Sequence, residues 1–160
     1  NRETDEWLKQ NQKSTREFLR KWGHYCKHDA LMKPIIPPKY DIGFIIQNPN
    51  LQLLEVLEPW CSTVYCDEQF IVGRVSDYVE MEDTSYDLYK KIKPYDNEKN
   101  NHILVTIDGN NFNQEDFTLL NQLSEIIQDN GELGEFELGN LKIGIYNLTT
   151  FEKGLILITK

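Results

Sequence analysis

Cysteine is scarce in this chain of 160 residues, and long apolar runs are missing altogether. Three cysteines, Cys26, Cys61 and Cys66, are too few and odd in number, so a framework of disulfides is not expected and a reducing compartment fits best. No apolar run approaches the roughly 18 residues that a membrane-spanning helix needs. We therefore expect a cytoplasmic protein with no direct membrane insertion.

Positive charge is also in short supply. The chain has 17 Lys and Arg against 26 Asp and Glu, which gives a net charge of -9. Surfaces that bind nucleic acid or anionic lipid need clustered basic side chains to neutralise phosphates, so we expect neither as a partner. The 39% hydrophobic content is nevertheless enough for a core, and a chain of this length can bury about 70% of its unfolded surface.

Prolines divide the chain into three parts. The stretch KPIIPPKY holds three prolines in five positions, which excludes a helix or a central strand. We expect an N-terminal helical segment over 1–32, a proline-rich connector over 33–39 and one α/β domain over 40–160. The methionines are Met32 and Met81 alone, so we expect the natural start upstream and a larger parent protein.

The first segment has the spacing of an amphipathic helix from Thr4 to Trp22. Thr4 is suited to cap its start, and Gly23 is a natural stop. The middle of the helix is polar, so we expect Phe18, Leu19 and Trp22 to anchor it. Their partner would be the 40–160 domain, the parent's upstream domain or a second copy of the chain, with Trp7 and Leu8 more mobile.

The remainder alternates strand and helix patterns. Gly139-Asn140 lies between two alternating apolar stretches and predicts a two-residue hairpin. We expect a Rossmann-like three-layer α/β domain with a mostly parallel sheet and an antiparallel C-terminal hairpin edge, preceded by the N-terminal helix. Buried-strand patterns occupy 40–48, 62–68 and 102–109, helix patterns occupy 50–60, 84–92 and 113–131, and a last strand follows at 154–160.

Ligands of open parallel sheets bind beyond the carboxyl ends of the strands. The candidates there are Asn48 after the first strand, Asp67 after the second, and Asp108 and Asn110 after the strongest strand. Asp67 could hold a ribose hydroxyl of a nucleotide or of S-adenosylmethionine, or it could be a solvated strand end. The first turn, Gln47-Asn48-Pro49-Asn50, has no glycine, which removes the phosphate-cradling fingerprint.

Metal and catalytic signatures are incomplete. His24 and His28 could share a helix face near Cys26, but neither these residues nor the Cys61/Cys66 pair has the tight spacing of a zinc signature. The acidic run Glu80, Glu82 and Asp83 is typical of a solvated loop. We therefore assign no metal ligand, no catalytic residue and no cofactor.

The segment REFLRKWG resembles the closing segment of family-two glycosyltransferases, in which a helix carrying an aromatic residue runs into Lys-Trp-Gly. The matching residues are Phe18, Lys21, Trp22 and Gly23. The resemblance covers about 20 residues and implies a nucleotide-sugar site upstream, which agrees with the lack of any Asp-x-Asp in this chain.

Two functions follow as expectations. The first is a non-catalytic C-terminal accessory or interaction domain of a larger protein, such as a glycosyltransferase of glycan or polysaccharide synthesis. The alternative is a degenerate Rossmann-like domain, related to methyltransferases, that binds a nucleotide or S-adenosylmethionine through Asp67.

Overall fold

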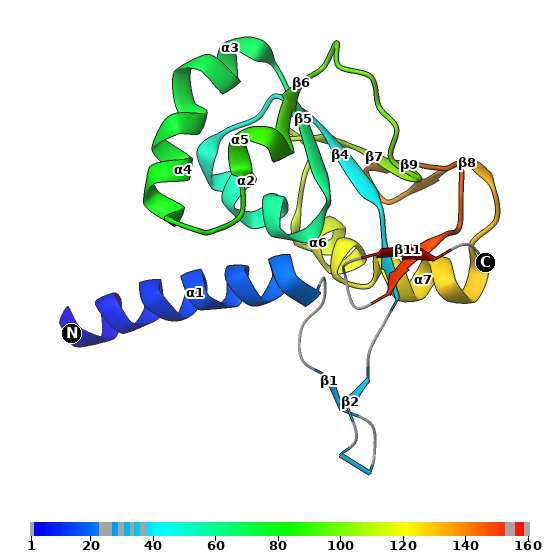
Figure 1. Cartoon of the computed structure of the whole chain (residues 1–160), viewed down its shortest axis with the longest axis horizontal. Helices are drawn as coiled ribbons and strands as arrows, with labels where there is room; N and C mark the ends of the chain where they lie inside the picture. The colour runs from blue at the N-terminus through cyan, green and yellow to red at the C-terminus, as the bar shows by residue number, and fades with distance from the viewer. Residues whose placement is uncertain are drawn as a thin grey trace.

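The computed structural model describes residues 2–22, 27–28, 31–32, 34–35, 38–152 and 156–158 (Figure 1). The expected helix stop at Gly23, the cluster around His24 and Cys26, and part of the proline-rich connector lie outside these residues. The helices are α1 (Arg2–Trp22), α2 (Leu51–Leu57), η1 (Glu58–Trp60), α3 (Glu68–Phe70), η2 (Ile71–Val75), α4 (Ser76–Glu82), α5 (Leu88–Lys91), α6 (Gln114–Asn121) and α7 (Leu123–Asn130).

A six-stranded sheet forms the centre of the fold, in the order β6-β5-β4-β7-β9-β8. Its strands are β4 (Ile42–Gln47), β5 (Thr63–Cys66), β6 (Ile92–Pro94), β7 (Ile103–Asp108), β8 (Gly134–Leu138) and β9 (Leu141–Ile145). The first four are parallel, and β9 runs antiparallel to both β7 and β8. The predicted α/β fold, with a mostly parallel sheet, an antiparallel C-terminal edge and a preceding helix, is confirmed.

The hairpin between β8 and β9 turns at Gly139-Asn140, as the sequence predicts. Gly139 has a φ of +62°, the conformation that glycine adopts without steric cost at the first position of a type II′ turn. Asp116 of α6 fastens this turn to the helix layer, because its buried carboxylate accepts hydrogen bonds from the backbone N–H and the side-chain amide of Asn140, both at 3.0 Å. The same carboxylate completes the capping box of α6 with Asn113.

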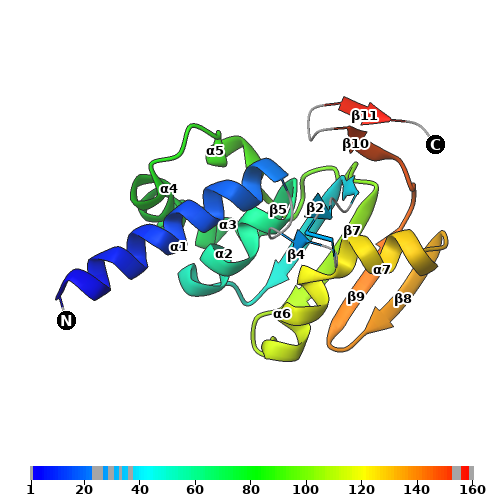
Figure 2. The same ribbon diagram turned by 90° about the horizontal axis from the view of Figure 1, so that it is seen from below.

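The helices pack on one face of the sheet, and α1, α2, α6 and α7 lie together on that side (Figure 2). Alternate side chains of the strands face them and form one core with buried leucines such as Leu54 and Leu120. On the opposite face, the segment 95–102 covers part of the sheet through Asn101, which donates to Asp41 and Thr63. In the described residues this segment takes the place of the second helical layer of a three-layer domain.

Five short strands lie apart from the large sheet. β1 (Lys27–His28) pairs with β2 (Pro34–Ile35), and β3 (Lys39–Tyr40) pairs with β10 (Thr150–Glu152), which pairs in turn with β11 (Ile156–Ile158). Pro38 directly precedes β3, so the connector leads into a strand that pairs with β10 of the C-terminal segment. No helix within the described ranges is long and apolar enough to cross a membrane.

The segment 68–82 differs from the sequence-based expectation. It is helical throughout, as α3, η2 and α4, and its acidic residue Glu82 is fully buried. The sequence did not reveal this helical segment, because an acidic residue such as Glu82 is typical of a solvent-exposed position. In the structure Glu82 pairs with Arg16 and Arg20 of α1, which are more than 60 residues away in the chain.

Candidate functional site

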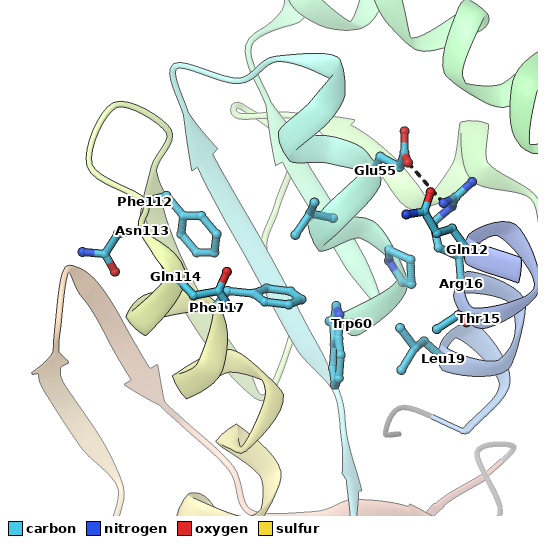
Figure 3. Close-up of a pocket in the computed structure, with 12 residues that line it drawn as sticks. Gln12, Thr15, Arg16, Leu19, Glu55, Trp60, Phe112, Asn113, Gln114 and Phe117 are labelled. Atoms are coloured by element: carbon cyan, nitrogen blue, oxygen red, sulfur yellow. Dashed lines mark hydrogen bonds and ion pairs between the residues drawn. The ribbon is translucent and has the colours of Figure 1, made fainter. Parts of the chain in front are cut away.

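A groove of about 510 Å³ opens between the C-terminal half of α1, the α2–η1 segment and the start of α6 (Figure 3). Its floor is apolar, and polar side chains form its rim. The floor residues are Leu19, Val56, Pro59, Trp60, Phe112 and Phe117, and the rim residues are Gln12, Thr15, Arg16, Glu55, Asn113 and Gln114. An apolar floor with a few polar groups is the usual composition of a binding site.

Trp60 is the central residue of the floor. Pro59 ends α2 and turns the chain into η1, which directs the Trp60 side chain between the helices. Its ring meets that of Phe117 edge to face, with the ring centres 6.1 Å apart (Figure 3). This geometry is favourable for two aromatic rings, so the pair joins η1 to α6 beneath the groove.

One wall of the groove is α1, and buried ion pairs hold it in place. Arg20 Nη2 lies 2.5 Å from Glu58 Oε1 and 2.6 Å from Glu82 Oε1. Arg16 makes two hydrogen bonds to Glu82, at 2.6 and 2.7 Å, and contacts Glu55 at 3.1 Å. We call Arg16, Arg20, Glu58 and Glu82 the arginine clamp, since the four side chains fix the helix to the domain.

Two further residues, Lys91 and Tyr78, contact the clamp through Glu58. Lys91 Nζ lies 2.6 Å from Glu58 Oε2, and the hydroxyl of Tyr78 donates to Glu58 Oε1 at 2.8 Å. Burial alone would raise the pKa of Glu58, but Lys91 and Arg20 outweigh it and lower the pKa below its ordinary value of 4.5. The pKa of Glu82 is lowered in the same way, by Arg16 and Arg20 against the effect of burial.

The lowered pKa values of Glu58 and Glu82 predict that the fold loses stability in acid. Both carboxylates stay charged in the folded protein at a pH where the unfolded chain binds protons, so their contribution is complete above about pH 4.5 and is lost as the pH falls through the folded pKa values. Urea unfolding between about pH 6 and about pH 3 measures this loss. Glu132→Gln is the control, because it removes an exposed carboxylate outside the clamp and should leave the profile unchanged. A flat stability profile of the unsubstituted chain would contradict the prediction.

The interaction candidates of α1 occupy two faces of the helix. Leu19 is buried in the core, as one anchor of the helix should be, whereas Phe18 and Trp22 are more than one-third exposed and pack on each other, with ring centres 6.5 Å apart. Trp7 is 65% exposed and lies about three helical turns before Phe18, on the same side of α1. Leu8 likewise lies about three helical turns before Leu19, on the same side of α1. The apolar face that packs on the domain through Leu19 therefore continues to Leu8.

Two of the strand-end candidates meet in the structure. The side-chain amide of Asn48, after β4, donates to Asp108 Oδ1 at 2.9 Å, at the point where the strand order reverses between β4 and β7. The backbone N–H of Asn110 and the amide of Asn111 donate to the same carboxylate. The pKa of Asp108 is therefore lowered, chiefly by the Asn110 N–H and then by Asn48, and the carboxylate is already engaged within its own turn.

Asp67 lies apart from this pair. It caps α3, accepting a hydrogen bond from the backbone N–H of Gln69 at 3.2 Å.

Burial raises the pKa of the Cys61 and Cys66 thiols to about 12 each, which keeps them protonated and poor as nucleophiles or metal ligands. Among the described residues, no three His, Cys, Asp or Glu side chains form a group that could hold a metal ion.

Sequence reasoning did not single out the clamp or the groove. The helical spacing of Arg16 and Arg20 was a usable signal, because residues four apart lie on one face of a helix and can share acidic partners. Glu58, next to Pro59 within an apolar stretch, was the matching signal in the domain. No family model matches the chain, and neither the curated proteins nor the solved structures contain a match.

Proposed function

We propose that this chain is a non-catalytic interaction domain of a larger protein, and that the groove, together with the face of α1 that carries Leu19 and Leu8, forms its binding surface. The observation that carries the proposal is the continuity of this surface. The groove floor at Trp60 adjoins Leu19, and the face of α1 that carries Leu19 continues along the helix to the exposed Leu8. Clustered apolar side chains that remain exposed mark surfaces for a protein partner.

The proposed partner is a helical segment with an apolar face. A helix fits because the surface is elongated along α1 and is bordered by it on one side, as in helix-in-groove recognition. The segment would come from the parent protein, upstream of α1. A family-two-like glycosyltransferase is the parent that the Phe18–Trp22 segment favours, and that assignment is part of the proposal.

The alternative, a domain that binds a nucleotide or S-adenosylmethionine, has weaker support. Asn48 and Asp108 lie at the switch point where such ligands bind, but their polar groups are bonded to each other and to the following turn. Asn50 caps α2 with its own side chain, accepting from the backbone N–H of Leu53 at 2.8 Å. A ligand would have to displace these interactions.

Photocrosslinking tests the proposal in the intact parent protein. A photoreactive phenylalanine replaces Val56, which is exposed at the groove, and the matched control replaces Glu135 on the open sheet face. We expect the Val56 position to crosslink to one defined segment of the same polypeptide, identified by mass spectrometry. Crosslinks to a second copy would identify the partner as another molecule of the same protein in a homo-oligomer, in place of a segment of the same polypeptide. The same diffuse products from both positions would refute the binding surface.

A further inference from the structure

A second groove, of about 420 Å³, lies at the C-terminal end of α1, near the amino ends of β5 and β6. It is separate from the apolar groove of Figure 3 and differs from it in charge. We call it the basic groove, and it is lined by Arg20, Lys39, Cys61, Ser62, Thr63, Tyr86, Asp87, Lys90, Lys91 and Lys93.

The basic groove collects positive charge in an acidic chain. Five of the 17 basic residues of the chain line it, although acidic residues outnumber basic ones by 26 to 17. Arg20 and Lys91 are neutralised by the glutamates of the clamp. Within the described residues, Lys39, Lys90 and Lys93 have no carboxylate within ion-pair distance, and Asp87 is the one acidic side chain of the lining.

Lys39 shows that the excess charge is held in place by the fold. Its position is set by the strand β3 that follows Pro38, and its Nζ points to the carbonyl oxygens of Arg20 and Lys21 at the end of α1, at 3.3 and 3.5 Å. Burial and, to a lesser degree, the nearby charge of Lys91 lower the pKa of Lys39. A lysine held beside another lysine is stabilised when an anion lies between them.

We infer that the basic groove is a binding site for the phosphate group of a small ligand. Lysine is a common phosphate ligand because its ammonium group offers three donors as a point charge. Three lysines that have no carboxylate partner among the described residues line this groove. Ser62 supplies a hydroxyl group to the lining. The volume falls in the range of small-molecule sites, about 300–1,000 Å³. This site goes beyond the proposed protein–protein function and is independent of it.

Inorganic pyrophosphate is a suitable probe, titrated into the whole chain by calorimetry at about 20 mM salt, where screening is weak. The test variant is Lys90→Gln with Lys93→Gln, which leaves Lys39 and the clamp intact. The matched control is Lys9→Gln with Lys13→Gln on α1, which changes the net charge equally away from the groove. We expect saturable binding to the wild-type chain, a loss of about tenfold or more in the test variant, and less than about a twofold change in the control.

Vesicles containing phosphatidylinositol 4-phosphate distinguish a lipid headgroup from a free ligand. Retention of the chain on the vesicles that pyrophosphate reverses would assign the phosphate to a headgroup, and pyrophosphate binding without retention would assign it to a free small molecule. The inference is overturned if pyrophosphate does not saturate the chain, or if the control variant loses as much affinity as the test variant. Thermal unfolding of both variants without ligand verifies that each remains folded.

Discussion

Replacing Arg20 by Ala should lower the free energy of unfolding by about 3–5 kcal/mol, the cost of leaving buried charges without their partner. Arg20 is the shared partner of Glu58 and Glu82, and both carboxylates are fully buried. Lys91 would still pair with Glu58 and Arg16 with Glu82, but each glutamate would lose its hydrogen bonds to the guanidinium of Arg20. Urea unfolding followed by circular dichroism at pH 7 measures the change.

Lys21→Ala is the matched control, since Lys21 is the next residue of α1 and is exposed. Its effect should stay within about 0.5 kcal/mol, as for most surface substitutions. Arg20→Met combined with Glu58→Met should recover part of the loss, because it removes a cation and an anion together and keeps most of the buried volume. Equal stability of Arg20→Ala and Lys21→Ala would show that the clamp does not hold α1 to the domain.

Replacing Trp60 by Ala should cost about 3–5 kcal/mol, as large-to-small substitutions of buried aromatic residues do. Trp60 is only 8% exposed, and its loss would remove the edge-to-face contact with Phe117 as well as much of the floor of the apolar groove. The free energy of unfolding in urea measures the cost, and fluorescence at the remaining tryptophans follows the same transition.

Val56→Ala is the control for this prediction, because Val56 lies at the same groove but is 40% exposed. We expect it to cost less than about 1 kcal/mol. If Trp60→Ala were no more destabilising than Val56→Ala, the floor of the groove would be loosely packed and unsuited to receive a defined partner.

The sequence was sufficient to predict the architecture. Ile103–Asp108 and Ile42–Gln47 were recognisable because a continuous apolar run marks a strand buried inside a parallel sheet. The hairpin was recognisable because Gly139 supplies the backbone conformation that its turn requires. One-sided packing was not predictable, since Leu104 and Thr106 have the composition of a covered strand although their face is partly open.

The sites were harder to predict, because charge pairing over long sequence distances leaves little local pattern. Glu82 resembles its exposed neighbours until Arg16 and Arg20 are brought beside it by the packing of α1. The same limit applies to the basic groove, in which Lys39 and Lys93 are distant in the chain and meet at one end of the sheet. Asn48 and Asp108 were each recognisable as residues at a strand end, but the sequence did not show that β4 and β7 are neighbours in the sheet.

The fixed attachment of α1 has a mechanical consequence. The helix has 21 residues and is therefore about 31 Å long at 1.5 Å per residue, and its N-terminal half extends past the domain (Figure 1). The clamp holds only the C-terminal half, so the N-terminal half is a rigid helical extension. A helical sequence continuing from Arg2 would therefore keep a fixed orientation about the axis of α1, relative to the domain. Inserting one residue into this extension would rotate the attached sequence about the helix axis by about 100°. Inserting seven residues would return the attached sequence to within about 20° of its original orientation.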